Sequence, residues 1–524
     1  MNPAPLNAVE LRRISKAFGA GSSRVVANAD VSLVARRGSI HAIVGENGAG
    51  KSTAMKILFG MQSPDSGEVL VAGKPVAWRN PTEAMAGGIG MVHQHFMLAG
   101  PYTVLENVVL GCEGAAAFSP IAKDRATARL RELGERYSMP VDPAAIVEEL
   151  PVGIQQRVEI LKLLYRDSQV LILDEPTAVL TPQEIDALFA NLRRLRDEGR
   201  TILIITHKLK EVLALSDEVT VLRHGRSVGS IETAKATAEL LAEWMVGRKV
   251  VLEVKAEQAS KPGAVRMKAS NLRLDAGRSK LRDLSFEVRA GEIVGIAGVE
   301  GNGQSELLRA LMDPSNPKVL EGGRVELLGE DVSRWPASRI RRLRAGFLPE
   351  DRHRDGMLLG ESVEQNLLLG LQHHPRFVRE VPGVGGLIRS EALAQALERA
   401  WTEYDLRPRK RGILGRGLSG GNQQKLVIAR EFEHDPEFLV AAHPTRGVDV
   451  GAIEWIHRRL FAARDGGAGV LLVSSELDEI LALSDRILVV FDGAIVAEFA
   501  RGAATPQELG LAMSGSGAGK GASA

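Results

Sequence analysis

The sequence predicts an α/β fold that is built twice, and three observations indicate it. Short apolar segments such as Ile40–Val44 alternate with longer segments of helical character. Each ends in polar residues, as parallel strands do when a ligand binds beyond their carboxyl ends. The same order of segments returns in the second half of the chain. The other strand candidates are Val170–Leu173, Ile202–Ile205, Ile293–Ala297, Phe438–Ala441 and Val470–Val473.

The internal repeat is collinear along nearly the whole chain. Gly45 corresponds to Gly298, 253 residues later, and Met245 corresponds to Met513, 268 residues later. The offset only rises between these points, so the second copy gains residues without losing the order. We therefore predict a first domain at 1–248, an exposed linker at 249–264, a second domain at 265–514 and a flexible tail at 515–524.

Composition excludes several classes of protein. The 524 residues include 66 Lys and Arg against 65 Asp and Glu, and only 4% are aromatic. This balance argues against a protein that wraps nucleic acid. Cys112 is the single cysteine, which excludes an intrachain disulfide and a cysteine zinc site. No secretory leader at Met1–Arg12 and no apolar stretch of about 20 residues is found, so we expect the chain not to cross a membrane by itself.

A glycine-rich loop follows the first predicted strand and opens a helix. Its sequence fits the pattern Gly-x-x-x-x-Gly-Lys-Ser/Thr, in which backbone N–H groups point at phosphates. Lys51 would then reach the β- and γ-phosphates of a nucleotide, and the Ser52 hydroxyl would ligate Mg²⁺. A chance glycine-rich turn is the alternative. The loop consists of Gly45, Glu46, Asn47, Gly48, Ala49, Gly50, Lys51, Ser52 and Thr53.

Two further strands deliver polar side chains to the same predicted sheet edge. Asp174 is suited to hold Mg²⁺, and Glu175 is suited to orient or deprotonate an attacking water. His207 follows the next strand and would contact the γ-phosphate, although a lone histidine is more often structural. Gln94 follows a short apolar segment and would ligate Mg²⁺ or the water, but by itself it indicates nothing.

These pieces, in this order, resemble the ATP-binding subunit of an ABC transporter, present twice. The helical signature of that family, Leu-Ser-Gly-Gly-Gln, is nearly intact at 418–422 and is followed by two glutamines. The resemblance implies two tandem P-loop NTPase domains, each with a mainly parallel core sheet, an antiparallel β subdomain and a helical signature subdomain. It implies that Lys51, Glu175, His207 and Gln94 serve catalysis. It places Phe18 on adenine, where Phe18 could equally pack at a strand edge.

In this family the domains pair head to tail, so the resemblance implies two composite ATP sites within one chain. The first site joins the Lys51 loop to Ser419, Gly420, Gly421 and Asn422. The second site has lost its key groups, since Gln304 replaces the lysine and Glu306 replaces Thr53. We expect the first site to hydrolyse ATP and the second to bind it weakly or without turnover. The second site comprises Gln304, Ser305, Glu350, Ala442, His443 and Ser475, with Pro151 and Gly153 from the first domain.

Two such domains in one chain resemble the sugar and nucleoside importers, and residues 92–98, 349–352 and 444–451 resemble the nucleoside branch. This implies two integral membrane permeases as partners, an extracytoplasmic substrate-binding protein as an indirect partner, no nucleic acid, and a peripheral position on the cytoplasmic face of the inner membrane. The regions that follow Gln94 and Glu350 would dock the permeases. The extra residues at Val378–Ile388 would make the two contacts differ, or form a neutral surface loop. The alternatives are a monosaccharide importer, a soluble ATPase acting on ribosomes or DNA, and a regulatory protein that binds ATP without turnover.

Overall fold

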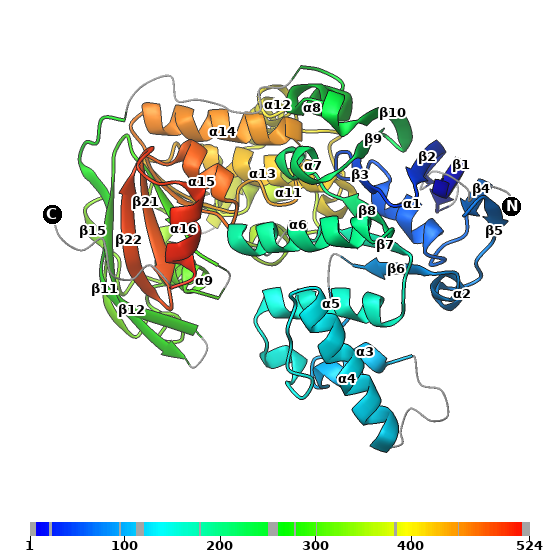
Figure 1. Ribbon diagram of the computed structural model, residues 1–524. Coiled ribbons are helices and arrows are strands. Elements are labelled where there is room, and N and C mark those ends of the chain that lie inside the picture. Colours follow the sequence, from blue (N-terminus) through cyan, green and yellow to red (C-terminus); the bar gives the residue numbers. More distant parts are fainter. Residues whose placement is uncertain are drawn as a thin grey trace, which may run out of the picture. The chain divides into compact units, whose positions relative to one another are not determined.

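Figure 1 shows the computed structural model of the chain. The structure describes residues 7–19, 24–93, 96–111, 120–177, 180–249, 260–276, 279–299, 301–381, 385–448 and 450–515. It divides into two compact units, Met1–Leu252 and Glu253–Ala524, called unit 1 and unit 2 below. The division falls within the predicted linker at 249–264. Most of that linker, nearly all of the predicted tail, Gln94 and Cys112 lie outside the described residues.

Unit 1 alternates strands and helices as the sequence predicts. Its elements are β1 (Asn7–Phe18), β2 (Val25–Arg36), β3 (Ile40–Val44), α1 (Lys51–Leu58), β4 (Ser66–Val71), β5 (Lys74–Val76), α2 (Pro81–Ala86), β6 (Ile89–Val92), α3 (Val104–Val109), α4 (Pro120–Arg136), η2 (Val147–Glu149), α5 (Val152–Tyr165), β7 (Val170–Asp174), α6 (Pro182–Asp197), β8 (Thr201–Ile205), α7 (Leu209–Leu215), β9 (Glu218–Arg223), β10 (Arg226–Glu232), η3 (Thr233–Lys235) and α8 (Ala238–Val246).

Two sheets organise unit 1. The larger has the order β10-β9-β3-β8-β7-β6, and its pairs are parallel except for β9 with β10. The smaller is antiparallel, with the order β2-β1-β4-β5. Helices α3, α4 and α5 extend away from the sheets as a separate helical part (Figure 1). The predicted core sheet, antiparallel subdomain and helical subdomain are therefore all present.

The core of unit 1 lies on both faces of the larger sheet. Ile172 and Leu203 pack with α1 and the antiparallel sheet on one face. Leu171 and Ile202 pack with α5 and α6 on the other. Because neighbouring residues of a strand point to opposite faces, β7 and β8 must be apolar throughout. This is why they appear in the sequence as continuous apolar segments.

Unit 2 repeats the order of the strands and main helices of unit 1, with additions. Its elements are β11 (Val265–Ala276), β12 (Ser279–Arg289), β13 (Ile293–Ala297), α9 (Gln304–Met312), β14 (Gly322–Leu327), β15 (Glu330–Asp331), α10 (Ala337–Ile340), β16 (Ala345–Leu348), η4 (Arg352–Gly356), α11 (Val363–Leu368), β17 (Val378–Val381), β18 (Gly385–Ile388), α12 (Ser390–Thr402), η5 (Gly415–Gly417), α13 (Gly420–Phe432), β19 (Phe438–Ala442), α14 (Val450–Asp465), β20 (Gly469–Val473), α15 (Leu477–Leu483), β21 (Arg486–Phe491), β22 (Ala494–Ala500) and α16 (Pro506–Met513).

The sheet topology of unit 2 matches that of unit 1 strand for strand. Its larger sheet has the order β22-β21-β13-β20-β19-β16, with only β21 and β22 antiparallel. Its smaller sheet has the order β12-β11-β14-β15. All six strands expected from the apolar segments are present, with ends that agree to within one residue. The predicted fold class and its duplication are confirmed.

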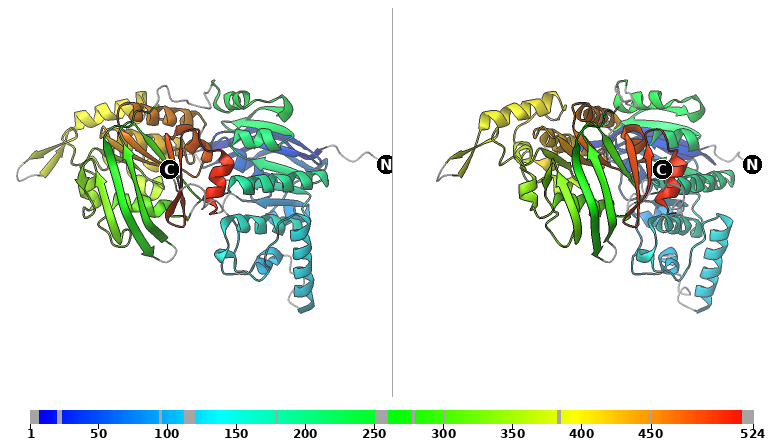
Figure 2. Two further views of the ribbon diagram at one scale, coloured as in Figure 1. Left: turned by 60° about the vertical axis from the view of Figure 1, so that its left-hand side comes forward. Right: turned by 90° about the vertical axis from the view of Figure 1, so that its left-hand side faces the viewer.

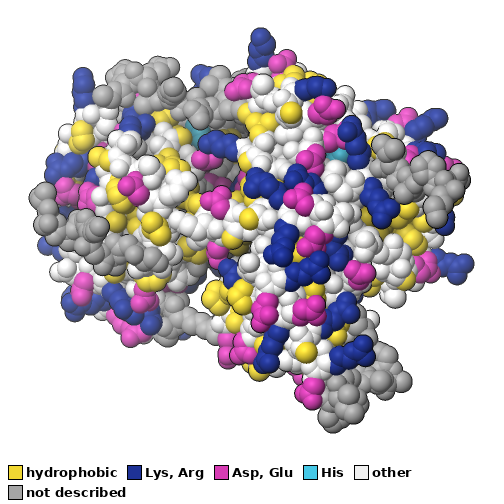
Figure 3. All heavy atoms as spheres, in the orientation of Figure 1, with side chains coloured by type: hydrophobic (Ala, Val, Ile, Leu, Met, Phe, Trp, Pro, Cys, Tyr) yellow, Lys and Arg dark blue, Asp and Glu magenta, His cyan; other side chains and the backbone are white. Residues whose placement is uncertain are grey.

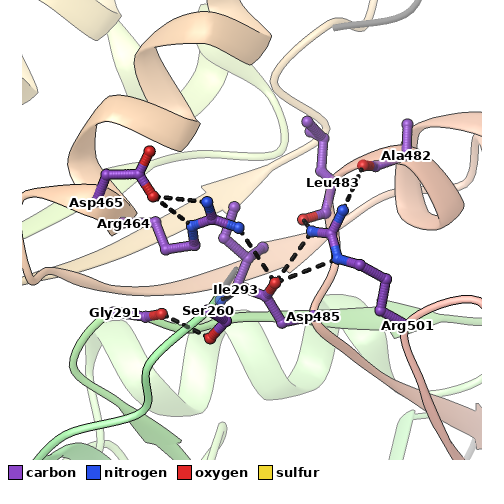
Figure 4. Close-up of polar contacts among 9 residues, drawn as sticks. All are labelled: Ser260, Gly291, Ile293, Arg464, Asp465, Ala482, Leu483, Asp485 and Arg501. Carbon is purple, nitrogen blue, oxygen red and sulfur yellow. Dashed lines mark hydrogen bonds and ion pairs between the residues drawn. The ribbon is translucent and has the colours of Figure 1, made fainter. Parts of the chain in front are cut away.

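A polar network at the start of the central strand is duplicated as well, and Figure 4 shows the buried copy in unit 2. In unit 2, Asp485 accepts hydrogen bonds from Arg464 at 3.2 Å and from the backbone N–H of Ile293 at 2.9 Å. In unit 1, Asp217 accepts from Arg196 at 3.0 Å and from the N–H of Ile40 at 2.8 Å. In both units the aspartate thus joins the start of the central strand to the end of a helix. The network satisfies a backbone donor at the sheet edge opposite the predicted site.

Unit 2 contains one element that follows from its extra residues. Strands β17 and β18 form an antiparallel hairpin in which Val378 pairs with Ile388. Figure 2 shows this hairpin projecting from unit 2, next to α12. Leu387 and Ile388 are exposed on it.

The molecular surface is mixed in charge. On the face seen in Figure 3, acidic and basic side chains are interspersed over both units. Among the described residues, no helix is both long and apolar enough to span a lipid bilayer.

Candidate functional site

Three parallel strands of unit 1 end at one edge of the larger sheet, and the predicted site residues follow them. Strands β3, β7 and β8 end at Val44, Asp174 and Ile205, and β8 lies between the other two. The loop after β3 reaches α1 through Gly50, whose φ of 94° lies in the left-handed region. A Cβ at Gly50 would lie 2.4 Å from the carbonyl oxygen of Ala27, so this position requires glycine.

Lys51 begins α1 and is buried beneath the loop. Its Nζ donates hydrogen bonds to the carbonyl oxygens of Gly45 at 2.7 Å and Glu46 at 3.0 Å. Burial lowers the pKa of Lys51, while the carboxylates of Glu175 and Asp174 act in the opposite direction. The first N–H groups of a helix have no partner within the helix, and an ammonium held beside them suits a bound polyphosphate.

Asp174 and Ser52 meet at the end of β7. The Asp174 side chain is buried and accepts a hydrogen bond from the Ser52 hydroxyl. Burial and the neighbouring Glu175 carboxylate raise the pKa of Asp174, and the bond from Ser52 opposes this. A carboxylate and a hydroxyl oxygen, both beside the phosphate loop, form a donor set that fits Mg²⁺.

Glu175 is aimed at His207 by an unusual backbone. Its φ of 49° lies in the left-handed region, and its N–H donates to the carbonyl oxygen of Ile205 at 2.8 Å. His207 Nδ1 lies 3.0 Å from Glu175 Oε1. Burial raises the pKa of Glu175, but the hydrogen bond and charge of His207 keep it below its ordinary value. Glu175 is therefore ionised at neutral pH, as a group that accepts a proton or orients a water must be.

The remaining predicted residues of this site are Phe18 and Gln94. Phe18 ends β1 with 40% of its surface exposed, and Lys16 Nζ lies 5.8 Å from the ring centroid. An exposed ring of this kind can stack on a base, and its role on adenine stays a prediction. Gln94 lies outside the described residues.

The corresponding loop of unit 2 keeps its shape and loses its charge. Gly303 has a φ of 112° and precedes α9, as Gly50 precedes α1. Gln304 occupies the position of Lys51 and is only 8% exposed, and its Oε1 has no hydrogen-bond partner in the described part of the chain. A neutral amide replaces the ammonium, and Glu306 adds a carboxylate to the first turn of α9.

The other polar positions of unit 2 form a network of their own. Ser305 donates to Glu350 at 2.8 Å, and Glu350 lies 3.8 Å from His443 Nε2. The N–H of Ser475 donates to His443 Nδ1 at 3.3 Å. Ala442, in place of Asp174, is a buried apolar residue. Glu350 thus takes the sequence position that corresponds to Gln94, and β19 ends at Ala442, where β7 of unit 1 ends at a carboxylate.

The two signature regions differ in their ability to bind an anion. Ser419 caps α13, and its hydroxyl accepts from the N–H of Asn422, which leaves Gly420 and Gly421 in the first turn. In unit 1, Pro151 takes the capping position of α5 and makes no side-chain cap hydrogen bond. Gly153 packs against Glu184, which brings a carboxylate to that helix end. Repulsion of phosphate follows, because Glu184 opposes the positive end of the helix.

A groove in the helical part of unit 1 was not predicted from the sequence. Its volume is about 1350 Å³, and none of the predicted site residues lines it. Asn107 shapes its wall, since the buried amide bonds the carbonyl oxygens of Ala99, Tyr102 and Thr103. Asn366 corresponds to Asn107 in the sequence and makes the corresponding bonds in unit 2. The groove lies in the region after Gln94 that the sequence predicts as a docking surface.

Comparison with known proteins agrees with this geometry. A family model described as ABC transporter matches residues 29–178 and 281–446. The chain is 43% identical to the nucleoside import ATP-binding protein NupA of Lactococcus lactis subsp. cremoris, over 97% of this chain and 98% of that protein. It is 43% identical to the guanosine import ATP-binding protein NupO of Bacillus subtilis, over 97% of each. It is 44% identical to the glucose import ATP-binding protein TsgD13 of Haloferax volcanii, over 97% of this chain and 96% of that protein.

Proposed function

The chain belongs to the ABC transporter family, and from this premise we propose that it is the ATPase subunit that energises a nucleoside importer. One observation carries the proposal. Lys51, Ser52, Asp174, Glu175 and His207 converge at a single sheet edge of unit 1, in contact with one another or with the phosphate loop. This set can bind a nucleoside triphosphate and activate a water molecule for attack on its γ-phosphate.

We assign each of these groups a role in hydrolysis. On arrival of ATP, Lys51 exchanges its loop carbonyls for phosphate oxygens. Ser52 and Asp174 would hold Mg²⁺, which when bound neutralises charge on the phosphates. Glu175, ionised and held by His207, orients the attacking water and accepts its proton.

In this proposal only one of the two sites turns over. The first site takes its phosphate loop from unit 1 and its signature, Ser419–Gly421, from unit 2, as the family pairing implies. The second site would combine Gln304 and His443 with the capping proline, Pro151. It has neither the ammonium nor the catalytic carboxylate, so it would bind nucleotide weakly or without hydrolysis.

Membrane permeases are the proposed partners, two of them, fed by an extracytoplasmic substrate-binding protein. The groove beside α3 and α4 offers a concave surface of mixed charge and apolar character for a permease segment. Tyr102 and Leu110, which line it, are exposed by 56% and 53%. The chain would then lie at the cytoplasmic face of the inner membrane.

The cargo assignment rests on the relatives and on sequence similarity to the nucleoside branch. Two relatives at 43% identity carry nucleoside names, while the Haloferax relative, at 44%, is a glucose import protein. A monosaccharide is therefore the second candidate cargo. The relatives match over 97% of this chain, which favours an importer over a soluble ATPase that acts on ribosomes or DNA.

The test is purification of the tagged chain from its native membranes with whatever proteins it retains. Co-purifying membrane permeases support the importer, and ribosomal proteins or DNA would contradict it. The retained complex is then reconstituted in vesicles with its binding protein and ATP. Uptake of labelled guanosine over labelled ribose or glucose supports the nucleoside assignment, and the reverse preference would replace it with the sugar.

A further inference from the structure

One arginine joins two sequence motifs of unit 2 that the ATP site does not otherwise use. Arg352 begins η4, directly after Glu350 and Asp351, and its side chain is half-buried. Its Nη1 donates to the carbonyl oxygen of Arg446 at 2.8 Å, across a separation of 94 residues. Its Nε lies 3.4 Å from the Oε1 of Gln423 in α13. The guanidinium therefore links the segment after Glu350 to the loop after β19 and to the signature helix.

The guanidinium also lies against the signature turn itself. A Cβ placed at Gly420 would lie 2.9 Å from Nη2 of Arg352, and one at Gly447 would lie 3.3 Å from it. The absence of side chains at these two glycines makes room for the arginine. Burial lowers the pKa of Arg352, the adjacent Asp351 carboxylate acts in the opposite direction, and Arg446 adds to the effect of burial.

Unit 1 lacks this arrangement, and the loss parallels that of its signature. Phe96, two residues after Gln94, takes the place of Arg352, two residues after Glu350. Val152 takes the place of Gly420, and its side chain would fill the space that the guanidinium occupies in unit 2. The arginine thus occurs only beside the signature that is intact.

From these contacts we infer that Arg352 is a positioning residue for ATP hydrolysis at the first site. It fixes the turn Ser419–Gly421 to the loop at Arg446 and to the segment after Glu350. The backbone N–H groups of Gly420 and Gly421 are thereby held in place for the γ-phosphate, with a positive charge behind them. Movement of the segment after Glu350 would be passed to the signature through the same side chain. This inference rests on the proposed function, because it requires that the unit 2 signature serve the Lys51 site.

The test compares Arg352→Ala, Arg352→Lys, Glu175→Gln and the control Arg354→Ala in the assembled transporter. Arg354 is a matched neighbour in η4 that is exposed and pairs with the adjacent Asp355. For each variant, kcat and the KM for ATP are measured, along with the thermal unfolding midpoint and binding of a fluorescent ATP analogue to the purified chain.

We expect Arg352→Ala to lower kcat at least tenfold, since misplacement of a positioning group by about 1 Å can cost 10²-fold in rate. Analogue binding and the unfolding midpoint should stay close to wild type, because the Lys51 loop is untouched. Arg352→Lys should recover part of kcat, since it keeps the charge but not the planar fork. Arg354→Ala should match wild type.

Three results would overturn the inference. The first is wild-type kcat in Arg352→Ala while Glu175→Gln is inactive. The second is a lower kcat in Arg352→Ala together with a clearly lower unfolding midpoint, with no recovery of kcat in Arg352→Lys. This result would indicate a merely structural role. The third is an active Glu175→Gln enzyme, which would refute the proposed function itself and, with it, the inference.

Discussion

The ends of β7 and β19 have nearly the same backbone and opposite chemistry. Glu175 and His443 have φ values of 49° and 44°, and their N–H groups donate to Ile205 and Val473 at 2.8 and 2.7 Å. One position carries a carboxylate that is hydrogen-bonded to a histidine, and the other carries a histidine that lies 3.8 Å from a glutamate. Unit 2 thus keeps the backbone conformation of the site but not its charged side chains. Backbone geometry and catalytic chemistry are separable properties of this fold.

The replaced positions of unit 2 are not random losses. Ser305 donates to Glu350 and the N–H of Ser475 donates to His443, so these polar groups have partners within unit 2. Unpaired polar groups would destabilise a half-buried edge. The comparison therefore indicates a structural role for residues that have no catalytic counterpart.

The largest expected difference between the ends of β7 and β19 is their contribution to the rate of ATP hydrolysis. Glu175→Gln removes the proton acceptor and keeps the shape, so the ATPase rate of the assembled transporter should fall by about 10²–10⁴. His443→Gln, the matched change in unit 2, should alter it by less than about threefold. Steady-state phosphate release measures both. Equal losses would show that both edges catalyse.

Affinity for ATP gives the next difference. Lys51→Met keeps the length of the side chain and removes its charge, so ATP binding should weaken by roughly 10- to 100-fold, as expected for one charge-assisted contact. Gln304→Met should change the affinity little. Titration of the purified chain with a fluorescent ATP analogue compares them. Similar weakening by both variants would mean that unit 2 contributes equally to binding.

Acid should destabilise both units, each through a buried histidine. Burial lowers the pKa of His41, on β3 of unit 1, to about 4, and burial likewise lowers the pKa of His434, which follows α13 in unit 2, to about 4. Since the ordinary pKa is near 6.5, the unfolded chain binds a proton that the folded one excludes. Stability is therefore full above pH 6.5 and falls as the pH is lowered toward 4.

At pH 5 this loss is worth about 2 kcal/mol in the free energy of unfolding of unit 1. Hydrogen exchange of peptides covering β3 and β13, at pH 7.5 and 5.0 in the full chain, reports each unit separately. His41→Val should remove the acid sensitivity of β3 and leave that of β13. An unchanged acid sensitivity of β3 in that variant would assign it to other groups.

The smallest expected effect concerns a feature that the units share. Thr103 with Glu106, and Ser362 with Gln365, form capping boxes at the starts of α3 and α11. Thr103→Ala and Ser362→Ala should each lower the free energy of unfolding by about 1 kcal/mol. Chemical denaturation measures this. A clearly larger loss in one unit would show that its cap also supports the neighbouring loop.

Local pattern was sufficient for much of the molecule. The phosphate loop is contiguous, so Gly45–Thr53 could be recognised without any knowledge of contacts. The strands were predicted to within one residue because they are buried on both faces. Their ends differ where a polar or small residue extends them, as Thr201 does at the start of β8 and Gly469 at the start of β20.

Contacts between residues far apart in the sequence could not be predicted from local patterns. The partner of Arg352 lies 94 residues away, and its sequence neighbourhood gives only a charged segment after Glu350. The hairpin β17–β18 was visible only as extra length, since its glycines and alternating residues carry no strong strand signal. The groove near Asn107 depends on three helices whose packing no local pattern specifies.

The left-handed backbone at His443 has a consequence for protein engineering. A carboxylate grafted onto that position would inherit the direction that Glu175 has, without any remodelling of the main chain. Ala442→Asp, His443→Glu and Gln304→Lys would therefore be the starting exchanges for a retrofitted second ATPase centre. Pro151→Ser would complete the set, because Pro151 (φ −53°, ψ 148°) and Ser419 (φ −65°, ψ 158°) have nearly the same backbone and only the serine hydroxyl can cap the helix.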